Sequence, residues 1–222
     1  MLTDLLEKMG FTLPQHEWQK PVVGVSACLL GQKVRYDGDH KHNATLVHQL
    51  GPLLSFRDTC PEVAIGLPVP RPPIQVVQVD DALLVKGVEN PQQDVTEALE
   101  DVAAGMSEPL SGFVLKARSP SCGHLSTPVH NAGGQQIGMA SGAFARKLHE
   151  LFPRIPLAND SDLEKPAFLQ SFLLQVYCYH QWHHSHHQGQ WLNDMQAQSE
   201  QLDEPLHSGL RHYLDKLGQA MH

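Results

Sequence analysis

The chain has 222 residues, of which 41% are apolar and 18% are charged, and its formal net charge is −8 with neutral histidines. This composition predicts an ordinary soluble protein that folds without disulfides, and four cysteines in so long a chain exclude a small secreted domain stapled by disulfides. No apolar run is long enough for a signal peptide or a membrane span, and Lys and Arg do not cluster as they do on nucleic-acid-binding surfaces.

The first part of the chain predicts a helix, a buried strand and a second helix. Residues 3–9 space their apolar side chains as a helix does, and Gly10 follows them as a typical helix end. After a connector with prolines, residues 21–31 predict a buried strand that ends in a loop. Residues 46–54 predict a helix that a Gly-Pro pair interrupts, and Cys60 lies on the next loop.

The middle of the chain predicts an extended segment, a hairpin, a helix and a strand. Residues 61–73 contain five prolines, which favours a rigid extended chain over a helix or a central strand. Two β-type runs at 74–79 and 82–86 flank two aspartates and predict a hairpin at a sheet edge. A helix is expected to start at 90–91 and to continue to Met106, followed by a strand over 112–117.

The last third of the chain predicts helices. Ser141 is placed to cap a helix with apolar residues between 144 and 152, a long helix is expected from Pro166, and a weakly packed helical tail is expected beyond Trp182. The alternation of strands and helices predicts an α/β fold with a Rossmann-like, partly parallel sheet flanked by helices and a helical C-terminal appendage. We divide the chain into an N-terminal helix and connector (1–20), an α/β domain (21–155) and a helical, His-rich extension (156–222).

Three of the four cysteines, Cys28, Cys60 and Cys122, lie beside Gly, Pro or Ser at predicted junctions of strands and loops. No Cys-x-x-Cys pair is present, so the spacing alone leaves structural thiols, metal or cluster ligands, and a nucleophile or redox pair all open. Their placement favours metal binding, and three thiolates without an evident fourth ligand suit a 4Fe-4S cluster with one iron unligated by protein; zinc with three cysteines and a histidine competes. Cys178 lies in an apolar helical stretch, which predicts a buried, inert thiol.

Five motifs carry a resemblance to a known family. In chain order they are residues 25–31, 35–38, 60–62, 66–73 and 115–123. This set resembles the bacterial family that includes the thiouracil desulfidases, over about residues 20–150. The resemblance implies a Rossmann-like domain, a 4Fe-4S cluster held by Cys28, Cys60 and Cys122, and non-redox removal of sulfur from thiolated uracil to give hydrogen sulfide.

The resemblance also implies roles for other side chains. Glu62 and Ser119 are the expected catalytic pair: Glu62 would deprotonate water, and Ser119 would pass a proton or hold the substrate. The candidate substrate contacts are Ser26, Arg35, Asp37 and Arg118. Other interpretations stay open, since Glu62 can cap the next element, Ser119 can serve as a turn residue, and the charged side chains can form solvated ion pairs.

A run of histidines follows the long predicted helix. His180 and His184 are four residues apart, as are His183 and His187, so on a continuous helix each pair can chelate a metal ion; a solvent-facing tail that binds metal only incidentally is favoured.

We expect a cytoplasmic protein whose substrate is a small thiolated pyrimidine. No membrane partner and no bulk nucleic acid are expected, and the sequence does not determine the oligomeric state. Some members of the resembling family carry a second C-terminal domain and act on thiolated uridine in RNA, whereas residues 166–222 match at most the start of such a domain. The alternatives are a desulfidase for thiouridine in nucleosides or tRNA, and a non-enzymatic iron-sulfur or zinc sensor.

Overall fold

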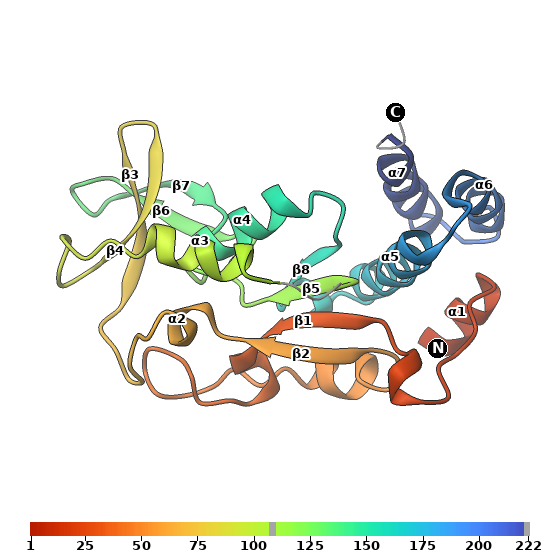
Figure 1. Ribbon diagram of the computed structural model, residues 1–222, viewed down its shortest axis with the longest axis horizontal. Helices are drawn as coiled ribbons and strands as arrows, with labels where there is room; N and C mark the ends of the chain where they lie inside the picture. The colour runs from red at the N-terminus through yellow and green to blue at the C-terminus, as the bar shows by residue number, and fades with distance from the viewer. Residues whose placement is uncertain (107–109, 220–222) are drawn as a thin grey trace.

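The computed structural model describes residues 1–106 and 110–219. Two sheets lie next to each other, and α1, α5, α6 and α7 gather at the end of the molecule far from the second sheet (Figure 1). Within the described residues, no helix is both long and apolar enough to span a membrane.

The first sheet is parallel throughout. Its strands are β1 (Val22–Ser26), β2 (Ser55–Thr59), β5 (Gly112–Leu115) and β8 (Leu157–Asn159), in the order β2-β1-β5-β8. The two central strands, β1 and β5, are almost entirely apolar and buried, as expected for strands that are covered on both faces. The predicted strands at 21–31 and 112–117 are therefore confirmed, whereas β2, with its polar sequence, was not predicted.

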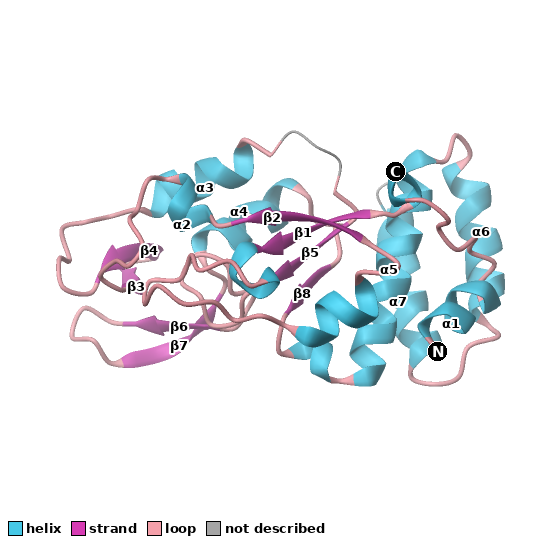
Figure 2. Ribbon diagram, turned by 90° about the horizontal axis from the view of Figure 1, so that it is seen from below, coloured by secondary structure: helices cyan, strands magenta, loops and turns pink. Residues whose placement is uncertain are grey.

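Helices cover both faces of this sheet. On one face, Val25 and Val114 pack in a large hydrophobic cluster with residues of α1, α5 and α7. On the other face, Phe113 and Leu115 pack with Phe144 of α4 and with neighbouring apolar residues. Figure 2 shows the same arrangement from below, with the helices around the parallel strands. The predicted α/β class with a parallel sheet is confirmed.

The second sheet is mixed. Its strands are β3 (Ile74–Val79), β4 (Ala82–Gly87), β6 (Thr127–His130) and β7 (Gln136–Ala140), in the order β4-β3-β6-β7. The antiparallel β3–β4 pair confirms the predicted hairpin, with β4 at the sheet edge. Strands β6 and β7 were not predicted because their residues are mostly small, polar or exposed.

The α-helices cover or connect the two sheets. They are α1 (Leu2–Lys8), α2 (Pro61–Ala64), α3 (Thr96–Ala104), α4 (Ala143–Leu151), α5 (Pro166–His184), α6 (Gln188–Ser199) and α7 (Leu206–Gly218). Shorter helical turns are Glu17–Gln19, Ala27–Leu30, Leu46–Leu50 and Asp162–Glu164. Gly10 has a φ of 74° after α1, which a glycine adopts without strain.

Two helix starts and one cap differ from the predictions. Residues 61–64 form α2 rather than extended chain, because Pro61 at the first helical position already has a φ angle that suits a helix. Helix α3 starts at Thr96 instead of 90–91, since Asp94 pairs with β4 and its carboxylate accepts the Thr96 N–H. Ser141 does not cap α4; its Oγ accepts the N–H of Leu125.

The C-terminal helices are packed more firmly than predicted. Helix α7 buries Leu210, Leu214 and Leu217 in the same hydrophobic cluster that covers the parallel sheet. The expectation of a weakly packed tail is therefore wrong, because apolar residues recur at helical spacing within the polar segment. Helix α5 ends at His184, so His183 and His187 do not share a helix.

Candidate active site

A cavity of about 510 Å³ opens at the carboxyl ends of the parallel strands. Ser26 ends β1, Thr59 ends β2 and Lys116 follows β5, and all three line the cavity. In open α/β sheets this edge gathers side chains from loops that are distant in sequence. The cavity lining contains every predicted cluster ligand, both predicted catalytic residues and three of the four predicted substrate contacts: Cys28, Cys60, Cys122, Glu62, Ser119, Ser26, Arg35 and Arg118.

The three thiols come from three different loops. Cys28 lies in the helical turn after β1, Cys60 directly precedes α2, and Cys122 lies on the loop after β5. Burial and the neighbouring Cys60 raise the pKa of Cys28 to about 11. Burial also raises the pKa of Cys60 and of Cys122. These thiols are therefore neutral until a positively charged group binds them, and such binding releases their protons.

The donor set fits an iron-sulfur cluster better than a single metal ion. Within the described residues, no three His, Cys, Asp or Glu side chains are grouped so that they could hold one ion. The described lining of the cavity includes no histidine, so nothing supports zinc on three cysteines and a histidine. Three thiolates facing one cavity are ligands suited to a cluster, and several cationic side chains also line the cavity wall. The cationic residues are Arg35, Lys41, Arg71, Lys116 and Arg118.

Backbone hydrogen bonds shape the loop that carries Cys122. The Ser119 Oγ accepts the N–H groups of Ser121 and Cys122, at 3.3 and 3.1 Å. The N–H of Gly142, just before α4, donates to the Gly123 carbonyl, and two N–H groups in the first turn of α4 donate to the carbonyls of Pro120 and Ser121. The turn role of Ser119 is thus present in the structure, and its hydroxyl hydrogen stays available because both of these contacts use the oxygen as an acceptor.

Ser26 supports this loop from β1. Its Oγ accepts the Lys116 N–H at 3.0 Å, and its hydroxyl is a hydrogen-bond partner of the Cys122 thiol. Ser26 is 2% exposed, so its side chain belongs to the wall behind the thiols.

Glu62 is held at both carboxylate oxygens. The Arg71 Nε donates to Oε2 and the Ser121 Oγ donates to Oε1, both at 2.8 Å. This ion pair is well shielded, because the Arg71 and Glu62 side chains are 4% and 12% exposed. Arg71 also donates to the carbonyls of Pro68 and Val34, so it ties the proline-rich segment to the loop after β1.

Sequence reasoning did not assign Arg71 and Ser121 to the site. One feature of the sequence could have pointed to Arg71, since it is the only basic residue between positions 61 and 73. No feature of the sequence could have pointed to Ser121, because its contact with Glu62 joins residues that are 59 positions apart.

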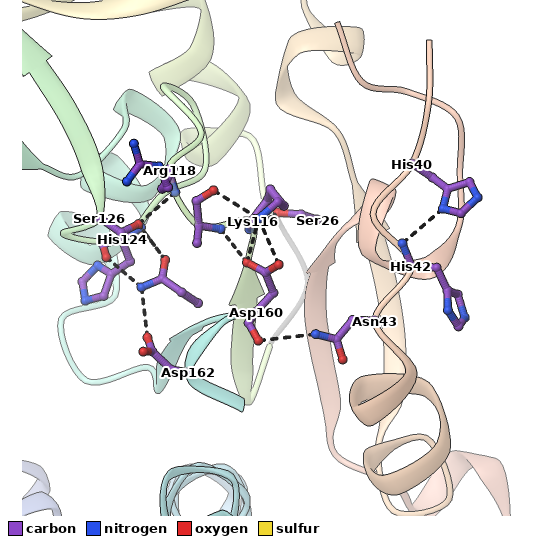
Figure 3. A network of polar contacts seen from close by, with 12 residues as sticks. Ser26, His40, His42, Asn43, Lys116, Arg118, His124, Ser126, Asp160 and Asp162 are labelled. Carbon is purple, nitrogen blue, oxygen red and sulfur yellow. Dashed lines mark hydrogen bonds and ion pairs between the residues drawn. The ribbon is translucent and has the colours of Figure 1, made fainter. Parts of the chain in front are cut away.

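A second ion pair lies at the cavity wall, between Lys116 and Asp160 (Figure 3). The Lys116 Nζ donates to both Asp160 oxygens, at 3.0 and 3.1 Å, and Asp160 Oδ1 also accepts the Ala117 N–H at 2.7 Å. The Asn43 side chain donates to the Asp160 carbonyl at 3.4 Å. These contacts hold the end of β5 against β8 and place a cation near Cys28. Lys116 and Asp160 were also not assigned by sequence reasoning.

The predicted charged contacts separate in space. Arg35 lines the cavity and pairs with Asp37 at 3.2 Å, while Asp37 itself is not among the described lining residues. Arg118 lines the cavity with an exposed side chain and a φ of 63°. Its N–H donates to Ser126 Oγ, which in turn donates to Asn159. Arg35 and Arg118 therefore remain candidate substrate contacts, and Asp37 serves as the partner of Arg35.

Cys178 is not among the described residues that line this cavity. It is fully buried in the hydrophobic cluster beside α7, and burial raises the pKa of its thiol. The prediction of a buried thiol is confirmed.

Comparison with known proteins gives one family and one solved structure. Residues 23–160 match the 2-thiouracil desulfurase family. The chain is 32% identical to the 4Fe-4S-dependent thiouracil desulfidase TudS (DUF523Vcz), with a TM-score of 0.51, and the match covers 69% of this chain and 99% of that one. No curated protein sequence matches the chain.

Proposed function

The chain belongs to the 2-thiouracil desulfurase family, and from this we propose that it converts thiouracil, or a related thiolated pyrimidine, and water into the oxo base and hydrogen sulfide. One observation carries the proposal: the thiols of Cys28, Cys60 and Cys122 reach the same cavity as Glu62. Thiols with a purely structural role need no carboxylate in the same cavity, whereas a hydrolytic reaction needs a base there. We assign this activity to the α/β domain, residues 21–155, and place the enzyme in the cytoplasm, where thiols stay reduced.

The cofactor that we propose is a 4Fe-4S cluster held by the three thiolates. The similar protein TudS is described as 4Fe-4S-dependent, which supports this assignment. When bound, the cluster supplies an iron without a protein ligand, a Lewis acid suited to the soft thiocarbonyl sulfur of the substrate.

Glu62 is the proposed general base. The reaction gives the water oxygen to the ring carbon and both water protons to the departing sulfur, so one group must first accept a proton from water. The Glu62 carboxylate lines the cavity and is fixed by Arg71 and Ser121, so it meets the water in one orientation. Ser119 is the proposed proton donor to the ring or its sulfur, because its hydroxyl hydrogen is not used within its loop.

The cationic wall supports the charge that develops in this reaction. Hydrosulfide is an anion, and Arg35, Lys41 and Arg118 line the cavity where it forms. The same cations favour, as a second candidate substrate, a thiolated pyrimidine that carries a ribose phosphate.

The test is turnover by the cluster-loaded protein. The chain is reconstituted without oxygen, and sulfide and oxo base are measured with 2-thiouracil, 4-thiouracil, thiouridine and its monophosphate. We expect turnover of at least one substrate, and Glu62→Gln is expected to keep the iron and lose turnover. An intact cluster with no sulfide from any of the four would overturn the enzymatic function and favour a sensor. Near-normal turnover by Glu62→Gln would remove Glu62 from the mechanism.

A further inference from the structure

A second cavity, of about 420 Å³, lies between the N-terminal connector and the end of α5. Its walls include Leu13 and Pro21 of the connector, Tyr177, His180 and His184 of α5, and Trp191 of α6. This site is separate from the cysteine cavity, because none of its described lining residues lines the other. Two histidines of the run thus line one cavity, with His180 partly buried and His184 exposed.

The two rings are arranged as a pair. Their centroids are 4.6 Å apart, one helical turn from each other. Two imidazoles that bind one ion through bonds of about 2.1 Å have centroids roughly 4.5 to 5 Å apart, so the observed separation suits a shared ion.

The Nδ1 atom of each ring already has a protein partner. The His184 Nδ1–H donates to the His180 carbonyl at 2.7 Å, and because a carbonyl can only accept, the Nε2 of His184 carries a lone pair. The His180 Nδ1 lies 3.0 Å from Ser111 Oγ. When the Nδ1–H of His180 donates to this hydroxyl oxygen, the Nε2 of His180 also carries a lone pair. Metal-binding histidines in proteins are typically oriented by such a partner on the second nitrogen.

We propose that His180 and His184 form a binding site for a divalent transition-metal ion at the end of α5. Imidazole nitrogen suits ions such as Zn²⁺, Ni²⁺ and Cu²⁺. Within the described residues no third His, Cys, Asp or Glu completes the group, so the ion keeps open positions for water or a small ligand in the cavity.

The residues that line the second cavity favour a metal ion as its occupant. No described Lys, Arg, Asp or Glu lines the cavity, so neither a competing cation nor a carboxylate partner stands beside the pair.

The test measures Zn²⁺ binding by calorimetry and metal analysis, with the full chain and its thiols occupied by the reconstituted cluster. We compare the wild type with His180→Gln and His184→Gln. The matched controls are His183→Gln, whose ring stacks on Tyr179 in the same turn, and His187→Gln, which lies beyond α5. Ser111→Ala tests the orienting contact.

We expect one Zn²⁺ per chain in the wild type and in both controls, and an affinity at least tenfold lower in His180→Gln and His184→Gln. Ser111→Ala is expected to weaken binding about tenfold, as the loss of a ligand's hydrogen-bond partner does at other metal sites. Equal weakening in all four histidine variants would show an adventitious histidine tail and overturn the site, as would no binding in the wild type. These outcomes do not depend on desulfidase activity.

Discussion

Replacing Ser121 by Ala tests whether the fixed orientation of Glu62 matters for the proposed reaction. Ser121 is fully buried, and its Oγ donates at 2.8 Å to Glu62 Oε1. The substitution removes this donor and leaves the carboxylate held from one side by Arg71. Ser121 does not line the described cavity, so the substitution removes no direct contact with the substrate.

The expected effect follows from the strength of that contact. A hydrogen bond to a charged group contributes about 1.5–3 kcal/mol. Because about 1.36 kcal/mol corresponds to a tenfold change in rate, kcat should fall by about tenfold to a hundredfold if the contact is needed in the transition state. KM should change by less than about twofold, since no substrate contact is removed.

The assay combines steady-state sulfide release with iron content and the absorption spectrum of the cluster. The matched control is Ser199→Ala, which removes an equally buried hydroxyl whose Oγ donates to the Gln196 carbonyl at 2.6 Å in α6. A kcat within twofold of wild type, with a full cluster, would refute the orienting role. A loss of iron in proportion to the loss of activity would assign Ser121 to cluster retention instead.

Three further predictions concern the framework of the protein. Cys178→Ser should leave iron and sulfide per chain unchanged, because this thiol lies in the core and does not line the cavity. Loss of the cluster would contradict the three-ligand set. Gly142→Ala should lower the free energy of unfolding by about 1–3 kcal/mol in denaturant titrations and reduce iron loading. The reason is that the new Cβ would lie 2.5 Å from the Pro120 carbonyl oxygen, beside the loop that carries Cys122. An unchanged denaturation midpoint would contradict this packing. Partial burial and the nearby Lys216 lower the pKa of His149 from its ordinary 6.5. The folded state therefore binds this proton less readily than the unfolded state, and stability is lost as the pH falls below about 6.5. His149→Gln should therefore lose less Tm between about pH 7 and pH 5 than the wild type, and an equal loss would exclude this histidine as a source.

The sequence predicted those parts of the fold whose signals are local. The apolar runs of β1 and β5 and the long helix from Pro166 are recognisable because burial on both faces or along one helix stripe leaves a pattern within a few residues. Strand β2 escaped prediction because its polar residues form a strand only through pairing with β1. The packing of α7 escaped for a similar reason, since its leucines acquire a partner only when the chain folds back onto α5.

The residues of the candidate site also fall into two groups, those that the sequence identified and those that only the structure revealed. The motifs around Cys28, Cys60 and Cys122 identified the family and the thiols, with Glu62 and Ser119 beside them, because chemically unusual residues next to Gly and Pro stand out along the chain. The partners of those residues did not stand out. Arg71 and Ser121 look like ordinary residues until the loops meet at Glu62.

The sequence by itself therefore determined the α/β class, the family and the identity of the three candidate thiol ligands. Only the tertiary structure decided that these thiols share one cavity, that Glu62 is held at both oxygens, and that His180 and His184 pair while His183 and His187 do not. The physical reason is distance along the chain. A strand, a helix or a motif is encoded within a few residues, whereas a hydrogen bond between residues 62 and 121 exists only after the parallel strands have brought their carboxyl ends to one edge.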